Sequence, residues 1–387
     1  MNDNINPGGE LYCDTRFFGI ERWYYGRPKD ADLRIPDDIL KSVCFLLVRP
    51  TNERGQEYDH YIGTAFFVII DRTIDNTPYS STPSLAPVRF AYLVTARHVI
   101  DNYKKAGYTQ FYVRLNTNDK DSKVIPIPDE WEYPDDKAAD VAVLPFLPDS
   151  RVFELYAIPT ILFIGPHTIS HPSLEIGVGD ELFIVGLFSR RYGYRRNIPI
   201  VRAGIISAMP DEPLVQETEE DEEGEEEPYL YYDAYLAEIK SISGLSGSPV
   251  FILFPPGRLA VDPLRPGLSL EDRWIFMLLG LVRGHWSVDQ VKTAGDSEPG
   301  EVESFNTGIA EVTPIEEASK VIFGRKLVEK RKEQQGEYRR KHAPTQDAVP
   351  PPERPLEPGV TREGFEEALR RSSRKIPSEP ESGKSET

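Results

Sequence analysis

The chain has 387 residues, and 39% of them are hydrophobic, so it can bury a large core and hold two domains with accessory segments. Its formal net charge is −18 at pH 7, and nine acidic residues lie within the eleven positions 217–227. The sequence has no dense basic stripe, which argues against nucleic acid as the main partner because phosphate binding depends on clustered Lys and Arg.

The cysteine content and the N-terminal sequence indicate the compartment. Only Cys13 and Cys44 occur, too few for the disulfide framework of a small secreted domain, so we expect free thiols, with a single bridge as the alternative. The N-terminus has neither the basic start nor the apolar core of a signal peptide, and no segment approaches the roughly 20 apolar residues of a membrane span. We therefore expect a cytoplasmic protein without membrane contact, unless the numbering already lacks a leader.

Short β-rich runs separated by turn residues follow one another from Ser42 onward. They predict eleven strands, at 43–48, 61–70, 89–95, 110–115, 141–146, 181–188, 201–208, 229–238, 249–254, 274–282 and 304–312. Regularly spaced strands with almost no helix between them favour a sandwich or a barrel over a parallel α/β sheet.

The sequence after the last strand predicts helices and a linker. A helix begins near Pro314, because Pro suits an early helical position and Ile315, Ala318 and Ile322 follow at helical spacing. Residues 326–341 are highly charged, as in a solvated helix, and run into a Pro-rich linker. A short amphipathic helix is expected at 361–374 as a contact for a protein partner, and the tail beyond it is expected to be disordered.

Three separated segments supply the residue types of a nucleophilic site. Ser246 lies between Gly244 and Gly247, while His98 and Asp140 precede it in the order His, Asp, Ser. A serine that attacks an amide needs a base within hydrogen-bond reach, and the base needs a partner that holds its tautomer. Gly244 tolerates backbone angles that let its N–H and that of Ser246 form an oxyanion hole. We predict Ser246 as nucleophile, His98 as base and Asp140 as the residue that orients the base.

Seven short motifs occur in one order along residues 40–325: GTAFFV (63–68), VTARHV (94–99), DVAVL (140–144), GLF (186–188), AGIIS (203–207), GLSGSP (244–249) and NTGIA (306–310). Together they resemble the trypsin-like, or chymotrypsin-fold, serine proteases, especially the disulfide-free bacterial branch related to the HtrA proteases. No PDZ-like region follows residue 325. The resemblance implies an all-β fold of two packed six-stranded antiparallel β-barrels, with a C-terminal helix and a disordered tail.

The resemblance also implies an activity and a domain plan. The activity is that of a serine endopeptidase that forms an acyl-enzyme intermediate, acts on a protein or peptide and needs no cofactor. After an N-terminal arm (1–37), the first barrel (38–165) supplies His98 and Asp140. The second barrel (166–325) supplies Ser246 and carries an acidic loop (211–228), which we expect to be mobile because like charges repel. A charged, Pro-rich tail (326–387) follows, and the triad lies in the cleft between the barrels.

Several positions depart from the motifs of that family. Leu245 replaces the acidic residue that pairs with a freshly cut N-terminus in the zymogens, so activation by that route is not expected. Ser248 replaces the second glycine, which is tolerable if its backbone angles are ordinary. Arg97 replaces a small residue beside His98. In the run 280–285, a basic residue stands where a serine usually supports the aspartate, and this could alter the geometry of the site.

Substrate preference depends on two cationic positions. Counting back six residues from Ser246 places Lys240 where trypsin-like enzymes have the floor of the S1 pocket, and His285 falls on its wall. Cations there favour an acidic side chain on the substrate. The alternative is that Lys240 is a solvated loop residue.

Other functions stay open at this stage. The chain could be an idle protease fold that serves as a scaffold or binds peptides in its cleft, or an enzyme that cuts only itself or one partner. The spacing of His60, His167 and His171 does not suit a metal site, so we predict no metal.

Overall fold

The computed structural model describes residues 27–28, 35–70, 90–165, 174–189, 192–217, 229–239, 244–258, 273–291 and 302–342. Most of the predicted arm with Cys13, most of the acidic loop, Lys240 and the predicted helix at 361–374 lie outside these residues. The described residues as far as Gly336 belong to one compact unit, and those from Glu337 onward belong to a second.

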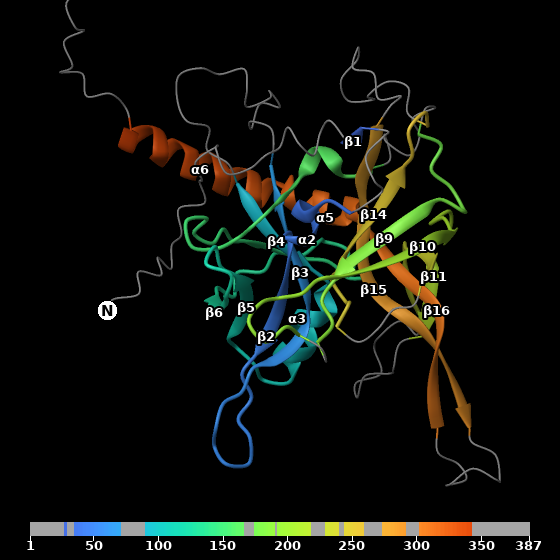
Figure 1. The fold of residues 1–387 in the computed structure, drawn as a ribbon, viewed down its shortest axis with the longest axis horizontal. Helices are drawn as coiled ribbons and strands as arrows, with labels where there is room; N and C mark the ends of the chain where they lie inside the picture. The colour runs from blue at the N-terminus through green and yellow to red at the C-terminus, as the bar shows by residue number, and fades with distance from the viewer. Residues whose placement is uncertain are drawn as a thin grey trace, which may run out of the picture. The chain divides into compact units, whose positions relative to one another are not determined.

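The first barrel is an antiparallel sheet with the strand order β6-β5-β2-β3-β4-β7 (Figure 1). Its strands are β2 (Val43–Val48), β3 (His60–Ile69), β4 (Ala91–Thr95), β5 (Phe111–Asn116), β6 (Ser122–Ile127) and β7 (Ala142–Pro145). A short strand, β8 (Ile158–Pro159), runs parallel to β3. Glu132, which follows β6, exchanges backbone hydrogen bonds of 2.8 and 2.9 Å with Val143 in β7. This bridge joins the β6 side of the sheet to its other edge.

The second barrel is closed. Its strands are β9 (Glu181–Gly186), β10 (Ile200–Ala208), β13 (Tyr235–Glu238), β14 (Pro249–Phe254), β15 (Arg273–Val291) and β16 (Val302–Pro314). The order is β15-β14-β9-β10-β13-β16, and β15 pairs with β16 to complete the ring. The short β1 (Arg27–Pro28) pairs with β15, and β11 (Leu214–Glu217) pairs with β12 (Tyr229–Tyr232) in a separate two-stranded sheet. The predicted all-β class with two six-stranded barrels and C-terminal helices is confirmed.

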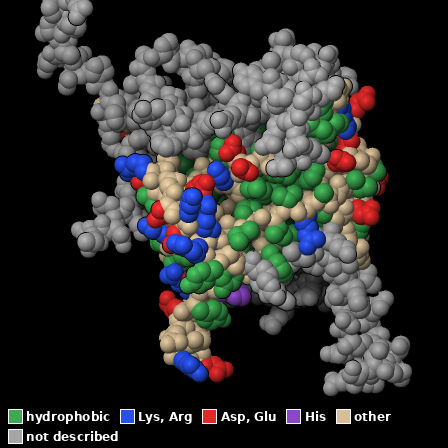
Figure 2. Space-filling model, in the orientation of Figure 1, with side chains coloured by type: hydrophobic (Ala, Val, Ile, Leu, Met, Phe, Trp, Pro, Cys, Tyr) green, Lys and Arg blue, Asp and Glu red, His purple; other side chains and the backbone are tan. Residues whose placement is uncertain are grey.

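Apolar strand residues fill the two barrels. Every residue of β2 and of β14 is buried, as expected for strands whose side chains are covered on both faces. The face of the molecule seen in Figure 2 also carries apolar side chains over β9 and β10, where Val201 and Ile205 are exposed, and Lys and Arg side chains over β5 and β6.

The helices differ in part from the sequence prediction. The expected C-terminal helices are present as α5 (Ile315–Ile322) and α6 (Arg325–His342). The expectation of almost no helix before residue 313 is wrong, because α2 (Asp37–Leu40), the 3₁₀ turn η3 (Thr160–Leu162) and α3 (Arg97–Lys105) occur earlier. In α3 the buried Val99 and Ile100 face the core. Lys104 and Lys105 lie in the last turn, where positive charge interacts favourably with the helix dipole. The signal was hidden because α3 follows β4 with a single residue between them.

The strand predictions fail in further places, and the short strands β1, β8 and β11 are also absent from them. The predicted strand at 229–238 is two strands, β12 and β13, separated by Asp233 and Ala234. The strand β6 was missed, because its residues are only partly buried and include Pro126. No helix among the described residues is both long and apolar enough to cross a membrane.

Candidate active site

The pair of His98 and Asp140 forms at the junction of β4, α3 and β7. Thr95 at the end of β4 pairs with Ala142 in β7, which brings the start of α3 beside Asp140. The backbone N–H of His98 donates to Asp140 Oδ1, and His98 Nδ1 is joined to Asp140 Oδ2, both at 2.8 Å. The two oxygens of one carboxylate therefore fix both the backbone and the ring of His98.

The charge state of Asp140 determines which nitrogen of His98 carries the proton. The Asp140 side chain is 7% exposed and that of His98 is 37% exposed. Burial alone raises the pKa of Asp140, but the hydrogen bonds and charge of His98, with a smaller contribution from the charge of Arg283, bring the pKa below its ordinary value. An ionised carboxylate only accepts, so Nδ1 is the donor, and in the neutral ring Nε2 keeps a lone pair.

The turn that carries Ser246 lies against the first barrel. Thr64 in β3 donates its backbone N–H to Ser246 O (3.0 Å) and its hydroxyl to Gly244 O (2.9 Å). Gly247 has φ +80°, and a Cβ on it would lie 2.3 Å from both Thr64 O and Thr95 Oγ1. Only glycine fits this close approach. The contact places the residue after Ser246 against Thr95, three positions before His98.

The same turn contains Gly244, whose N–H is predicted with that of Ser246 to form the oxyanion hole. Gly244 has φ +96°. Gly247 N–H donates to Val282 O (2.8 Å), and Ser248 N–H donates to Leu245 O (2.9 Å). The N–H groups of Gly244 and Ser246, by contrast, have no acceptor among the described residues.

Three departures from the family motifs have local structural settings. Leu245 is fully buried in the apolar core of the second barrel, so the turn is anchored by hydrophobic contact and not by an ion pair. Within the described chain, the non-glycine residues with positive φ are Lys120 and Glu175, so Ser248 needs no backbone angle that only glycine adopts. Arg97 pairs with Asp101 at 2.9 Å and lies over the ring of Tyr133.

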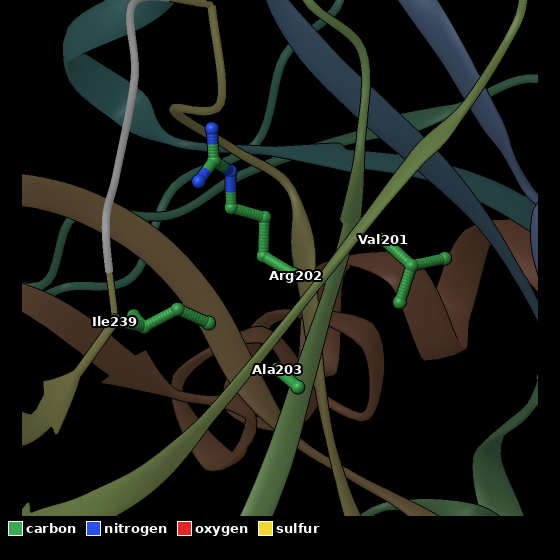
Figure 3. A pocket seen from close by; sticks show the side chains of 4 residues that line it. All are labelled: Val201, Arg202, Ala203 and Ile239. Carbon is green, nitrogen blue, oxygen red and sulfur yellow. The ribbon is translucent and has the colours of Figure 1, made fainter.

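The predicted specificity residues are only partly visible. Lys240 lies outside the described residues, and the backbone of His285 in β15 pairs with Ala310. A pocket of about 360 Å³ is lined by Val201, Arg202 and Ala203 of β10 and by Ile239, the residue before Lys240. Figure 3 shows these four side chains.

Sequence reasoning missed several residues that contact the site segments. Thr64 and Thr95 lie within recognised motifs, and their hydroxyls were the available signal. Ala138, Tyr232 and Glu311 had no such signal, because they are connected to the site through Arg283, which is distant from Ala138 in sequence. In the part of the chain described here, no group of three or more His, Cys, Asp or Glu residues is arranged to hold a metal ion, and Cys44 is a buried free thiol.

Comparison with known proteins gives distant structural likenesses. No protein-family model matches the chain, and no curated protein matches it in sequence. Among solved structures it is similar to Deg5, with 14% identity over 73% of this chain and 88% of that one, at a TM-score of 0.35. It is also similar to the active form of the Rv3671c protease from M. tuberculosis, with 18% identity over 74% of this chain and 81% of that one, at a TM-score of 0.34. A third similar structure is catalytically inactive tobacco etch virus protease in complex with substrate, with 11% identity over 78% of this chain and 87% of that one, at a TM-score of 0.34. With identities and TM-scores this low, these likenesses say nothing about activity.

Proposed function

We propose that this protein is a serine endopeptidase in which Ser246 is the nucleophile, His98 the general base and then acid, and Asp140 the residue that orients His98. The observation that carries the proposal is the double hydrogen bond from His98 to Asp140, combined with the docking of the Ser246 turn on Thr64 and Thr95. A buried carboxylate that fixes one ring nitrogen leaves the other available for a hydroxyl.

The residues support a two-step reaction. Ser246 Oγ attacks the carbonyl carbon of the peptide while His98 Nε2 takes the hydroxyl proton, and the N–H groups of Gly244 and Ser246 donate to the oxyanion. His98 then gives that proton to the leaving amine, which departs and leaves an acyl group on Ser246. A water molecule repeats the sequence, giving one proton to His98, releasing the acid and restoring the Ser246 hydroxyl.

Digestion of a peptide library tests the activity. Wild type is expected to produce fragments whose summed masses exceed that of the parent peptide by one water per cut. Ser246→Ala is expected to lose about 10³-fold or more of the rate, because the acyl intermediate cannot form. Ser248→Ala is the matched control, since its buried hydroxyl has no partner in the described chain. Equal cleavage by Ser246→Ala and wild type would reject the proposal.

A second candidate is a scaffold that binds peptides without cutting them. It is favoured by one observation: the hydrogen bonds of the His98 ring among the described residues go to Asp140 and not to Ser246. Contacts of this kind often tighten only when substrate binds. Library peptides that bind the wild type and remain intact would favour the scaffold.

We also propose a preference for acidic residues before the cut bond. Support comes from the sequence positions of Lys240 and His285 and from the cation Arg202 in the cavity beside Ile239. Buried or partly buried cations favour anionic groups. The same library decides this point, because cleavage after basic or large apolar residues contradicts it.

A further inference from the structure

Arg283 connects the second barrel to the segment that carries Asp140. It lies in β15, at the irregularity between Val282 and Gly284 where the pairing with β16 shifts register. Its Nη1 donates to the carbonyl oxygen of Ala138 at 2.9 Å. Ala138 precedes Asp140 by two residues in the first barrel, so this hydrogen bond spans 145 positions of sequence and joins the two barrels beside the candidate site.

Among the described residues, an aromatic ring and a carboxylate hold Arg283 in place. Its guanidinium carbon lies 3.8 Å from the ring centre of Tyr232, a distance typical of cation–π contact. Its Nε lies 3.7 Å from Glu311 Oε2, and both side chains are only 15% and 17% exposed. Tyr232 donates its hydroxyl to the same Glu311 oxygen at 3.0 Å. A guanidinium fixed in this way loses little further conformational freedom when it binds Ala138 O.

The Tyr232 hydroxyl stays protonated well above neutral pH, which keeps this arrangement intact. Burial, followed by the charge and the hydrogen bond of Glu311, raises the pKa of Tyr232 to about 12. The hydroxyl therefore stays protonated and continues to donate to Glu311. Tyr232 also packs with Ala138 and Ala234 in a small buried apolar cluster, so the ring under Arg283 touches the same residue that Arg283 binds.

The segment from Ala138 to Asp140 is a tight turn with its own hydrogen bonds. Ala138 N–H donates to Asp136 Oδ1 at 2.9 Å, and Val141 N–H donates to Ala139 O at 3.0 Å. Arg283 adds the contact from outside the barrel. The charged groups that face Asp140 are His98 from α3 and Arg283 from β15, both cationic when charged, and a cation near a buried carboxylate offsets the cost of burying its charge.

We propose that Arg283 is a positioning residue for Asp140: from the second barrel it fixes the turn 138–140 of the first barrel and supplies positive charge that keeps the Asp140 carboxylate able to hold His98. This inference rests on the proposed triad. It gives the basic residue in the run 280–285 a role that a serine hydroxyl fills only by hydrogen bonding. Docking of the two barrels then does more than bring Ser246 to His98, because it also completes the surroundings of Asp140.

Two variants separate the charge of Arg283 from its hydrogen bond. Arg283→Gln removes the charge, and Arg283→Lys keeps the charge but not the forked geometry. Arg258→Gln is the matched control, because Arg258 also pairs with a carboxylate, that of Asp180, and lies over an aromatic ring, that of Phe254, in the same barrel. Circular dichroism and thermal unfolding establish that each variant is folded.

The first measurement is the rate at which a fluorophosphonate acylates each variant, followed against pH. Arg283→Gln is expected to react about 10- to 100-fold more slowly, because misplacement of the orienting carboxylate misdirects the base. The acid limb of the pH–rate profile of Arg283→Gln is expected to move to higher pH by about half a unit, because the Asp140 carboxylate loses a cationic neighbour. Arg283→Lys is expected to restore the acid limb but only part of the rate. Rates and limbs equal to those of Arg258→Gln would overturn the proposal.

The second measurement does not require activity. A proton on His98 Nδ1 that is hydrogen-bonded to a carboxylate gives a low-field NMR resonance, identified by its loss in His98→Ala. Arg283→Gln is expected to broaden or shift this resonance, and Arg258→Gln is expected to leave it unchanged. If the probe fails to label wild type, the proposed function fails while the resonance still decides the role of Arg283. If wild type is labelled and the resonance is the same in Arg283→Gln, only the positioning role fails.

Discussion

At the scale of single residues, Asp140 holds His98 with both of its carboxylate oxygens. One oxygen accepts the backbone N–H of His98, and the other binds the His98 ring. An amide has one oxygen and one NH₂ group, so it cannot accept both hydrogen bonds. Asp140→Asn places an NH₂ group against a donor, so either the backbone contact or the ring contact is lost.

We expect Asp140→Asn to lower the rate of fluorophosphonate labelling by about 10⁴-fold while the protein stays folded, because the wrong tautomer of His98 is favoured. Asp149→Asn is the control, since that carboxylate pairs with exposed Arg151 away from the site. A labelling rate within threefold or so of the control would argue against the orienting role.

Asp140 also makes stability depend on pH. Its pKa in the folded state lies below its value in the unfolded chain, so its contribution is present above the unfolded value of about 3.9 and is lost as the pH falls through the folded value. Wild type is therefore expected to lose its advantage in unfolding free energy over Asp140→Asn as the pH is lowered from neutral into that range. Urea unfolding of both proteins at several pH values measures this. A constant difference would show that the ionised form is not favoured by folding.

Gly247 and Gly55 separate backbone strain from close approach. Both have positive φ, +80° and +75°, but a Cβ on Gly55 meets no atom within 4 Å, whereas one on Gly247 meets Thr64 O and Thr95 Oγ1. We expect Gly55→Ala to cost about 1 kcal/mol of unfolding free energy, and Gly247→Ala to cost more and to lower labelling of Ser246. If denaturant unfolding gives the same loss of unfolding free energy for both variants, the turn does not closely approach β4.

At the scale of elements, β3 holds the turn that carries Ser246 through the hydroxyl of Thr64. That oxygen donates to Gly244 O and accepts the N–H of Leu187 at 3.2 Å. Thr64→Val keeps the shape and removes both bonds, so we expect a cost of about 1–3 kcal/mol and slower labelling. Thr313→Val is the matched control, because the Thr313 hydroxyl is buried and has no partner among the described residues, and its loss is expected to be neutral or stabilising. Unfolding curves that show the same cost for both would contradict the assigned contacts.

The sequence allowed the strands and the site segments to be predicted where the signal is local. The run 43–48 is recognisable as a buried strand because all six residues are apolar, and Ser246 is recognisable because glycines surround it. The helix α3 was missed because its start follows β4 so closely that the strand pattern masks it. The role of Arg283 had no local signal, since its contact with Ala138 lies 145 positions away.

At the scale of the whole compact unit, the barrels are joined by polar contacts that only the fold brings together. The segment between β9 and β10 docks on β5, where Asn116 receives the N–H of Asn197 at 2.7 Å and donates to its carbonyl oxygen at 3.2 Å. Asn197 in turn donates to Arg114 O at 2.7 Å. The same segment begins near Ser189, whose backbone N lies 2.9 Å from where a Cβ on Gly244 would be.

This junction predicts a difference between two neighbouring asparagines. Asn116→Ala leaves the backbone groups of Asn197 without partners, so we expect a loss of about 1–3 kcal/mol and slower labelling. Asn118→Ala removes contacts with Ser150 and Arg151 that are exposed and stay within the first barrel, and its effect is expected to be within about 0.5 kcal/mol. Thermal unfolding of the two variants side by side checks this, and a larger loss for Asn118→Ala would reverse the interpretation.

The central claim is that Ser246 is a nucleophile activated by His98. Its most direct measurement is mass spectrometry of the protein after reaction with a fluorophosphonate, followed by identification of the modified residue. The predicted result is one adduct per chain, on Ser246, which is absent in Ser246→Ala and strongly reduced in His98→Ala. Folded wild-type protein that carries no adduct, or carries it on another residue, would contradict the claim.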